Sequence, residues 1–404
     1  MTAIVGVLNK HAVAIAADSA VTLGGGRKVM NGANKLFALS KYHPVAIAIY
    51  GNAEFIGTPW EIIIKEYRKQ LKDKSFPTLR MYVDDFQRFL KRRKYFCSEK
   101  EANDYLKSSV QGLYLNILQI CKNHPDRIDN VLSKLEQSKA QPLLGGFKDE
   151  TVTFFNEEVK KEVENGCKML QTEGITVDIV RMKEIIEAVF TRDVIPLGTT
   201  GLVFAGYGES EIFPSIYNCN VGCVINGLLA KVVKNASRIN KENLSGICPF
   251  AQTDVMHTIL DGVSPKMHEV YLHSLEQTFV KMKNALASLA ESSYPALASQ
   301  IRGLDITPFG TEFIKMSKTT QMKEYTMPFV RSVATLEKED LADFAESLIT
   351  LTSLKRKVSF DQETVGGPVD VMVISKGDGI IWMKRKHYFD PDKNHHFFSN
   401  YFNF

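Results

Sequence analysis

The chain has 404 residues, of which 44% are hydrophobic and 24% charged, a composition typical of a globular protein rather than a disordered one. Its formal net charge of +4, from 50 basic and 46 acidic side chains, is nearly balanced, so the composition gives no reason to expect a nucleic-acid partner. The six cysteines form no Cys-x-x-Cys pair, the N-terminus lacks a signal-peptide pattern, and no apolar run approaches roughly 20 residues. We therefore expect a cytoplasmic protein with reduced thiols and no membrane span.

The first fifty residues predict four short strands. Apolar runs at 2–7 and 12–17 flank a polar turn and indicate a hairpin covered on both faces, and runs at 35–39 and 45–50 repeat this form. From Trp60 the apolar residues recur at helical spacing, which predicts mainly helix to about residue 188. A hairpin within 142–156 is a further expectation.

Strand character returns in the second half of the chain. We expect strands at 201–208, 212–217 and 222–229, helices at 250–260, 273–291 and 336–354, and a final hairpin at 370–374 and 380–384 with a Gly-Asp-Gly turn. Two sheets between helical layers satisfy this order. We predict that 1–60 form the first half of a core and 201–262 its second part. Mainly helical insertions follow each of them, at 61–200 and 263–334. The last division, 335–404, contains a helix, strands and the C-terminal tail of the core.

Four short segments carry a family resemblance. They are TAIVGV from Thr2, AADS around Asp18, NKL around Lys35 and YGN around Gly51. Together they resemble the catalytic half of proteasome β subunits, and look closest to the bacterial HslV-type peptidase. In this family of N-terminal nucleophile hydrolases the mature chain begins at a threonine, and an aspartate, a lysine and a glycine follow at about these intervals.

Two later segments are similar to the family more loosely. Residues 245–252 resemble its glycine-serine-glycine turn and the helix after it, which places Ser245 or Gly246 opposite the family's serine. Residues 364–371 resemble the segment that leads into a late strand. The resemblance covers 1–60 well and roughly 200–260 and 335–385 loosely, and it implies an α+β fold, a four-layer αββα sandwich with large helical insertions.

The proposed chemistry needs these residue types for a reason of its own. A threonine hydroxyl requires an adjacent base, and a free α-amino group, with an ordinary pKa of roughly 7.7–8.0, exists on Thr2 only after Met1 is removed. A lysine near the hydroxyl favours the alkoxide, and a carboxylate keeps that lysine charged, which suits Lys35 and Asp18. A glycine amide such as that of Gly51 can stabilise the oxyanion without blocking the substrate.

Each of these residues also has an ordinary structural interpretation. Asp18 could close a turn, Lys35 could be a surface lysine, and Gly51 could simply end a strand. The combination, in this order and spacing, is far more specific than any one member. One departure weakens it: where the family has an aspartate and a serine that orient the terminal amine, this chain has Gln362 and Val365, although the flanking Asp361 and Glu363 could substitute.

We therefore expect a proteasome-like threonine peptidase or amidohydrolase that cleaves amide bonds of a peptide or protein, without a cofactor or metal. The family's usual use implies a homo-oligomeric ring and an ATP-dependent unfoldase, but insertions of this length could line, cap or block a ring, and the oligomeric state stays open. Two alternatives remain: a non-catalytic proteasome-like scaffold that binds protein partners, and a small-molecule amidase.

Other patterns in the sequence favour ordinary structure over a second site. The basic run at 91–96 is more typical of a solvated helix face than of a nucleic-acid contact. The histidines and aspartates at 387–396 could bind a metal, but among aromatic residues they better fit a docking tail. Cys219 and Cys223 indicate buried thiols, and the glycine run at 24–26 lacks the ending of a phosphate-binding loop.

Overall fold

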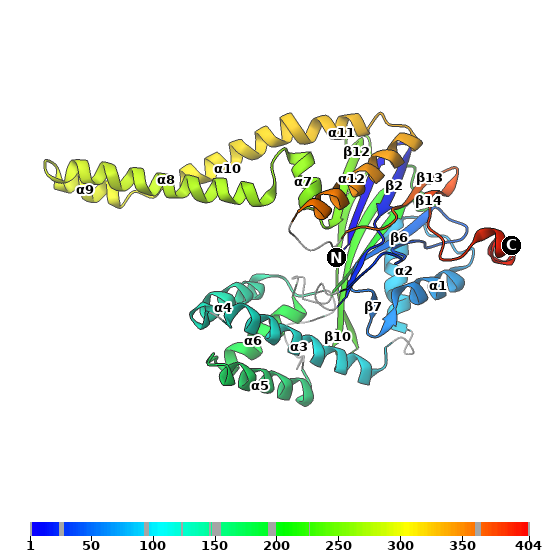
Figure 1. Ribbon diagram of the computed structural model, residues 1–404, viewed down its shortest axis with the longest axis horizontal. Helices are drawn as coiled ribbons and strands as arrows, with labels where there is room; N and C mark the ends of the chain where they lie inside the picture. The colour runs from blue at the N-terminus through cyan, green and yellow to red at the C-terminus, as the bar shows by residue number, and fades with distance from the viewer. Residues whose placement is uncertain are drawn as a thin grey trace.

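The computed structural model describes residues 2–23, 28–92, 97–122, 124–144, 147, 155–192, 199–225, 227–359 and 365–402. Within these residues the chain is a mixed α+β structure with two five-stranded antiparallel sheets at its centre (Figure 1). A lobe of helices and a long helical arm extend from the same side of this centre, and the N-terminus lies between their bases.

The first sheet contains the N-terminal strand as an interior strand. Its spatial order is β12 (Ser245–Ala251), β1 (Ala3–Asn9), β2 (Ala12–Ala17), β13 (Asp370–Ser375) and β14 (Gly379–Lys384). Every residue of β1, β2 and β13 is buried, because these apolar runs have partners on both faces of the sheet. The predicted first hairpin and the predicted final hairpin are confirmed.

The second sheet combines strands from both halves of the chain. Its spatial order is β11 (Leu228–Arg238), β10 (Ser215–Ile225), β9 (Thr200–Gly206), β6 (Val45–Gly51) and β5 (Leu36–Ala38). Two small ribbons lie beside the sheets, β3 (Val21–Leu23) with β4 (Lys28–Met30) and β7 (Glu54–Phe55) with β8 (Thr58–Pro59). The strands predicted at 35–39 and 45–50 are confirmed as β5 and β6.

The two sheets pack face to face through alternate residues of their strands. Ile4 and Leu8 of β1 share one apolar cluster with Ala46 of β6 and Ile216 of β10. The approach is close at Gly6, where an added Cβ would lie 2.5 Å from the Cδ1 atom of Ile216. A larger side chain at this position would therefore require the end of the Ile216 side chain to move.

Helices cover the outer face of each sheet. On the first sheet, α12 (Lys338–Val358) packs against β1, β2 and β13 through the other alternate set of side chains, such as Val5. On the second sheet, α1 (Trp60–Leu71) and α2 (Leu79–Arg92) pack over β6, β9 and β10. These two helices belong to the layered centre, so the part of the predicted 61–200 insertion that leaves the sheets begins after them.

The lobe is a separate helical bundle with a core of its own. It consists of α3 (Glu99–Cys121), α4 (Ile128–Glu136), α5 (Glu157–Thr172) and α6 (Ile179–Thr191). A side-chain cap begins three of these helices, from Ser98, Asn156 and Asp178. The far ends of β10 and β11 enter the apolar cluster of the lobe, which joins it to the second sheet.

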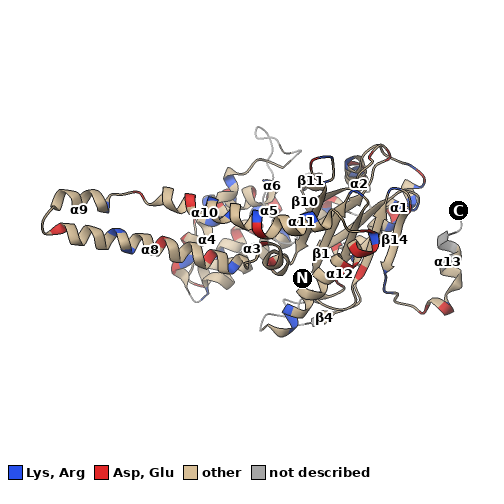
Figure 2. Cartoon of the chain, turned by 90° about the horizontal axis from the view of Figure 1, so that it is seen from above, with Lys and Arg blue, Asp and Glu red and all other residues tan. Residues whose placement is uncertain are grey.

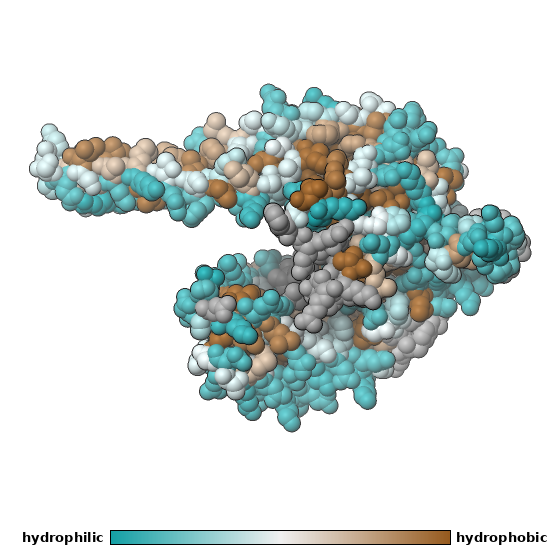
Figure 3. Space-filling view, in the orientation of Figure 1, coloured by the Kyte–Doolittle hydropathy of each residue, from teal (hydrophilic) through white to brown (hydrophobic). Residues whose placement is uncertain are grey.

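The arm is a helical extension with almost no core. After α7 (Asp254–Asp261) it consists of α8 (Pro265–Glu291), α9 (Pro295–Arg302) and α10 (Thr307–Gln321), and α11 (Met327–Val333) returns to the sheet. In α8 to α10, which are fully described, the buried residues are Ala287 and Ala298. Apolar side chains lie on its surface, and open space separates it from the lobe (Figure 3).

The middle of the chain differs from the sequence expectations in three places. The strands expected at 212–217 and 222–229 are one long strand, β10, followed by β11, which was not predicted because its polar residues mask the alternation. The helix expected from Phe250 begins at Asp254 instead, since 245–251 form the edge strand β12, where Pro249 is tolerated. Of the hairpin expected at 142–156, Leu143 bridges Arg192, while 145–146 and 148–154 lie outside the described residues.

The C-terminal end of the chain follows the final hairpin. After β14, a short helix, α13 (His395–Phe402), ends the described chain. Among the described residues, no helix combines the length and the apolar character that crossing a membrane requires.

Candidate active site

Thr2 directly precedes β1 and is held from both neighbouring strands. It is buried, with 7% of its surface exposed, and its carbonyl oxygen accepts a 3.1 Å hydrogen bond from the backbone N–H of Gln252, just beyond β12. The next residue, Ala3, pairs with Ala251 of β12 and accepts a 3.2 Å bond from the backbone N–H of Asp18. The backbone from the carbonyl group of Thr2 onward is therefore fixed.

The carboxylate of Asp18 is the centre of the hydrogen-bond network beside Thr2. Its Oδ1 atom accepts from the backbone N–H of Ala3 at 2.9 Å and from the Lys35 ammonium at 2.7 Å. Its Oδ2 atom accepts from the backbone N–H groups of Ala20 and Gly366, both at 3.1 Å. Asp18 is 1% exposed, and these four donors satisfy both of its oxygens.

Lys35 brings a buried ammonium group to this network. The residue is 3% exposed, precedes β5, and also donates to the carbonyl oxygen of Ala20 at 2.5 Å. Burial lowers the pKa of Lys35, and the attraction of Asp18 opposes this shift without cancelling it. Because Asp18 Oδ1 accepts from both groups, the ammonium lies within two hydrogen-bond lengths of the peptide nitrogen that follows Thr2.

Gly51 ends β6 on the same side of the molecule. The backbone N–H of Ile49 donates to the carbonyl oxygen of Lys35 at 2.8 Å, and Gly51 follows two residues later. Gly51 has a φ of +83°, and an added Cβ would lie 2.5 Å from the carbonyl oxygen of Thr199. The position therefore requires glycine for two independent reasons. The structure brings Asp18 and Lys35 together beside Thr2 and places Gly51 at the same strand ends.

Ser245, the fifth predicted site residue, does not join this group. It begins β12 and pairs with Asn9, at the opposite end of β1 from Thr2. At about 3.3 Å per residue along the strand, Ser245 therefore lies roughly 20 Å from Thr2. Its hydroxyl donates to the backbone carbonyl oxygen of Val330 in α11. The expectation was wrong because 245–251 run along β1 as an edge strand, so the end of that segment, not its start, lies beside Thr2.

The late segment that resembles the family contributes backbone rather than side chains. Val365, at the position of the family's serine, is fully buried in the apolar cluster under α12. The next residue, Gly366, donates to Asp18 and accepts from the backbone N–H of Ser19 at 3.1 Å. The flanking positions Asp361, Gln362 and Glu363 lie outside the described residues.

Sequence reasoning missed a second group of residues that supports Thr2. The guanidinium of Arg356, near the end of α12, donates to the side-chain oxygen of Gln252 and to Asp254 at 2.5 Å. This fixes the turn whose backbone N–H binds the carbonyl oxygen of Thr2. Ala251, the last residue of β12 just before that turn, has a φ of +66°, which is strained for a residue with a Cβ. No motif marks these residues, since their relation to Thr2 depends on the pairing of β12 with β1.

This arrangement can support a nucleophile at Thr2. A buried ammonium can stabilise negative charge on an oxygen close to it, and the low dielectric strengthens that effect. The Asp18 carboxylate, fixed by three backbone N–H groups, holds the ammonium in place. Opposite charges with satisfied partners are the arrangement in which a buried ion pair is tolerated.

The other sequence patterns form no comparable site. In the described part of the chain, no three histidine, cysteine or acidic side chains lie close enough together to hold a metal. This applies also to the histidines and aspartates at 387–396, which are all described. Cys219 and Cys223 are buried, and burial raises the pKa of both thiols, to about 11 and about 12. Acidic and basic residues are interspersed over the lobe and the arm (Figure 2). Residues 93–96 and 24–27 lie outside the described part.

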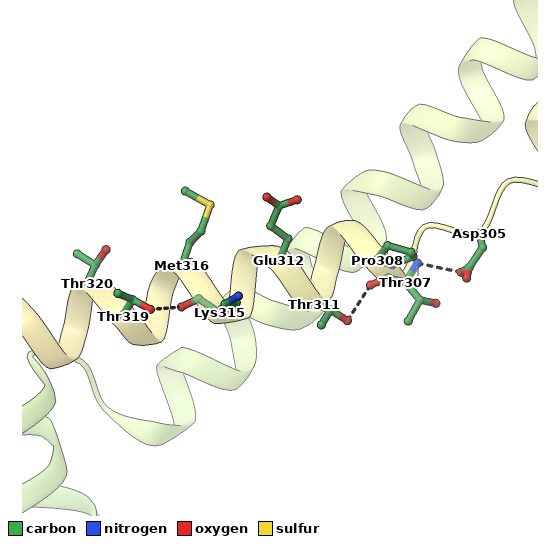
Figure 4. A pocket seen from close by; sticks show the side chains of 9 residues that line it. All are labelled: Asp305, Thr307, Pro308, Thr311, Glu312, Lys315, Met316, Thr319 and Thr320. Carbon is green, nitrogen blue, oxygen red and sulfur yellow. Dashed lines mark hydrogen bonds between the residues drawn. The ribbon is translucent and has the colours of Figure 1, made fainter.

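A surface hollow of about 770 Å³ lies along α10, in the arm. Its lining runs from Asp305 to Thr320 and includes Glu312 and Met316, whose side chains point away from the helix into open space (Figure 4). None of the predicted site residues lines it. A hollow so open, with no buried polar group aimed into it, does not compete with the Thr2 site.

Comparison with known proteins adds no assignment. No protein-family model matches the sequence, and no curated protein matches it.

Proposed function

We propose that this chain is a proteasome-like N-terminal nucleophile hydrolase, in which Thr2 cleaves amide bonds after the residue that precedes it is removed. In this proposal the two sheets and their outer helices are the four-layer αββα sandwich of that family, acting in the cytoplasm on a peptide or protein. The observation that carries the proposal is the buried Asp18–Lys35 pair, which is hydrogen-bonded to the peptide nitrogen next to Thr2.

The proposed reaction uses two groups of the same residue. The free α-amine of Thr2 takes the hydroxyl proton as the Oγ atom attacks the substrate carbonyl carbon, and the carbonyl oxygen becomes an oxyanion. The backbone N–H of Gly51 stabilises that oxyanion, and the charge of Lys35 stabilises the Thr2 alkoxide. The C–N bond then breaks, the α-ammonium returns its proton to the leaving amine, and water hydrolyses the ester in the reverse sequence of proton transfers.

Two features of the chain support an alternative, a non-catalytic scaffold with the same fold. Val365 places an apolar side chain where the family has a serine that orients the terminal amine. The arm carries exposed large apolar side chains, such as Leu289 and Met316, that suit contact with another protein better than contact with water. A scaffold does not need a free Thr2 or a reactive hydroxyl.

The test is covalent labelling at Thr2 combined with intact mass. We expect purified protein to begin at Thr2 and to gain the mass of one β-lactone acyl group, with Thr2→Ala unlabelled and Thr2→Ser labelled. Met1 retained in all molecules, or equal labelling of Thr2→Ala, would leave the scaffold as the better proposal. Hydrolysis of a peptide panel compared with small amides then separates a peptidase from a small-molecule amidase.

A further inference from the structure

A second buried ion pair lies next to the Thr2 site. Asp370, the first residue of β13, accepts from the backbone N–H of Lys386 at 2.9 Å and from the ammonium of the same lysine. The two side chains are 5% and 12% exposed. Lys386 thus binds Asp370 through its main chain and its side chain together, two residues after the end of β14.

Its place in the first sheet ties this pair to Asp18. Asp370 pairs across the sheet with Ala17, the residue before Asp18. The backbone N–H of Gly366, four residues before Asp370, donates to Oδ2 of Asp18, while Oδ1 accepts from Lys35. Both aspartates therefore sit where β2 meets β13, each with its own buried lysine.

Charge connects the two lysines. Burial is the main reason for the low pKa of Lys35, Asp18 raises it, and the like charge of Lys386 lowers it further. A cavity of about 100 Å³ lies against Asp370, Lys386 and Leu36, the residue after Lys35. Six other ionisable side chains line the same cavity: Glu61, Lys65, Arg68, Arg385, His387 and Tyr388.

We propose that Asp370 and Lys386 are positioning residues of the Thr2 site, whose opposite charges act on Lys35 in opposite directions across the β2–β13 junction. This inference rests on the proposed function for its catalytic meaning. The charge coupling itself concerns Lys35 alone and can be measured without a substrate.

The sign of each perturbation follows from the charges. Replacing Lys386 by Met removes the like charge that lowers the pKa of Lys35, and this favours the protonated form of Lys35. Replacing Asp370 by Asn leaves the cation of Lys386 uncompensated, which favours the neutral form of Lys35. Replacing both removes the two opposing charges together, so their effects cancel.

A purely structural role makes a different prediction. If the pair simply fastens the segment after β14 to the sheet, both single replacements loosen the same contact. They would then change Lys35 in the same direction, or leave it unchanged, and the double replacement would resemble either one.

The experiment is a pH titration of Lys35 by NMR in the full-length protein, labelled with ¹³C at the lysine Cε and assigned by loss of its signal in Lys35→Arg. We expect the midpoint to move up in Lys386→Met, down in Asp370→Asn, and back toward wild type in the double variant. Lys386→Arg, which keeps the charge, should stay near wild type. Unchanged midpoints, or shifts of the same sign in both single variants, would overturn the inference, and either single variant suffices if the other fails to fold.

The rate of β-lactone labelling at Thr2, followed against pH, separates this inference from the proposed function. The pH at which the labelling rate changes on the alkaline side of the pH–rate profile should shift between variants in the same direction as the titration midpoint of Lys35. Midpoint shifts of the expected signs without any labelling would leave the coupling and contradict the proposed hydrolase. If Thr2 is labelled but the alkaline side of the pH–rate profile is the same in all four variants, the proposed hydrolase stands and the positioning role of Asp370 and Lys386 is overturned.

Discussion

The two ends of strand β1 both bury polar side chains, but they use them differently. At its start, Asp18 and Lys35 form a buried ion pair beside Thr2. At its far end, Asn9 and Ser245 are equally buried, yet both are neutral and donate to backbone carbonyls in and just after α11. Neutral donors suffice to anchor a helix to a sheet, whereas buried charges carry a desolvation cost that structure alone does not require. This difference supports our proposal of chemistry at the start of β1, with anchoring at its far end.

Breaking the ion pair at the start of β1 should have the largest effect on stability. Asp18→Asn leaves the Lys35 ammonium buried without a counter-charge, and we expect a loss of about 3–5 kcal/mol in the free energy of unfolding. Urea denaturation measures this loss. The double variant Asp18→Asn with Lys35→Met should recover much of the stability and none of the labelling. An Asp18→Asn protein as stable as wild type would contradict the role of the pair.

Removing the ammonium should strongly reduce reactivity, while Asp18 keeps three backbone N–H donors. We expect Lys35→Ala to reduce the rate of hydrolysis or of β-lactone labelling by at least about 100-fold, which corresponds to about 2.7 kcal/mol. Lys35→Arg should not restore the rate, because the guanidinium is bulkier and differently shaped. Circular dichroism provides the control for the fold. An unchanged labelling rate in Lys35→Ala would remove the lysine from the mechanism.

The far end of β1 should respond in the opposite way. Ser245→Ala removes the hydroxyl that donates to the partly buried carbonyl oxygen of Val330 in α11, and we expect a loss of about 1–2 kcal/mol in the free energy of unfolding. Labelling of Thr2 should continue at the wild-type rate, since Ser245 lies at the opposite end of the strand. A large loss of labelling in a folded Ser245→Ala protein would return this serine to the active site.

The smallest expected effect concerns the strained end of β12 next to Thr2. Ala251 has a φ of +66°, which glycine adopts without strain, so Ala251→Gly should raise the free energy of unfolding by up to about 1 kcal/mol. The matched control is Ala3→Gly, at its extended partner in β1, which should lower stability by about 0.5–1 kcal/mol. Destabilisation by both replacements would show that the backbone at Ala251 is not strained.

Local patterns in the sequence were sufficient for the strands that are apolar on both faces. Continuous apolar runs predicted β1, β2, β5 and β6, and a Gly-Asp-Gly turn predicted the last hairpin. The pattern failed for β11, which includes Lys231 and Lys234, and for β12, in which Pro249 suggested the start of a helix. Both strands lie at sheet edges, where polar side chains and proline are compatible with pairing, so the local signal is weak.

The same limit applies to the candidate site. A family resemblance was sufficient to predict Asp18, Lys35 and Gly51, because it depends on their spacing after Thr2. Arg356 acts from a helix and reaches the site through Gln252, a relation that depends on how α12 packs on the sheet. Lys386 depends in turn on the pairing of β13 with β2 and on the path of the chain after β14. Tertiary contacts of this kind produce no characteristic spacing in the sequence, so Arg356 and Lys386 could not be predicted from it.

The central claim, that Thr2 acts with its own α-amine as the base, is tested most directly by the N-terminal residue. The measurement compares β-lactone labelling and peptide hydrolysis in three proteins: one with a cleavable N-terminal extension, the same protein after cleavage that exposes Thr2, and Thr2→Ala. An extension turns the amine into an amide, which cannot accept the hydroxyl proton, and it occupies the space that the substrate needs. We predict activity in the cleaved protein alone, with the same thermal stability before and after cleavage. Equal activity in all three proteins would contradict the mechanism, and inactivity of all three would favour the scaffold.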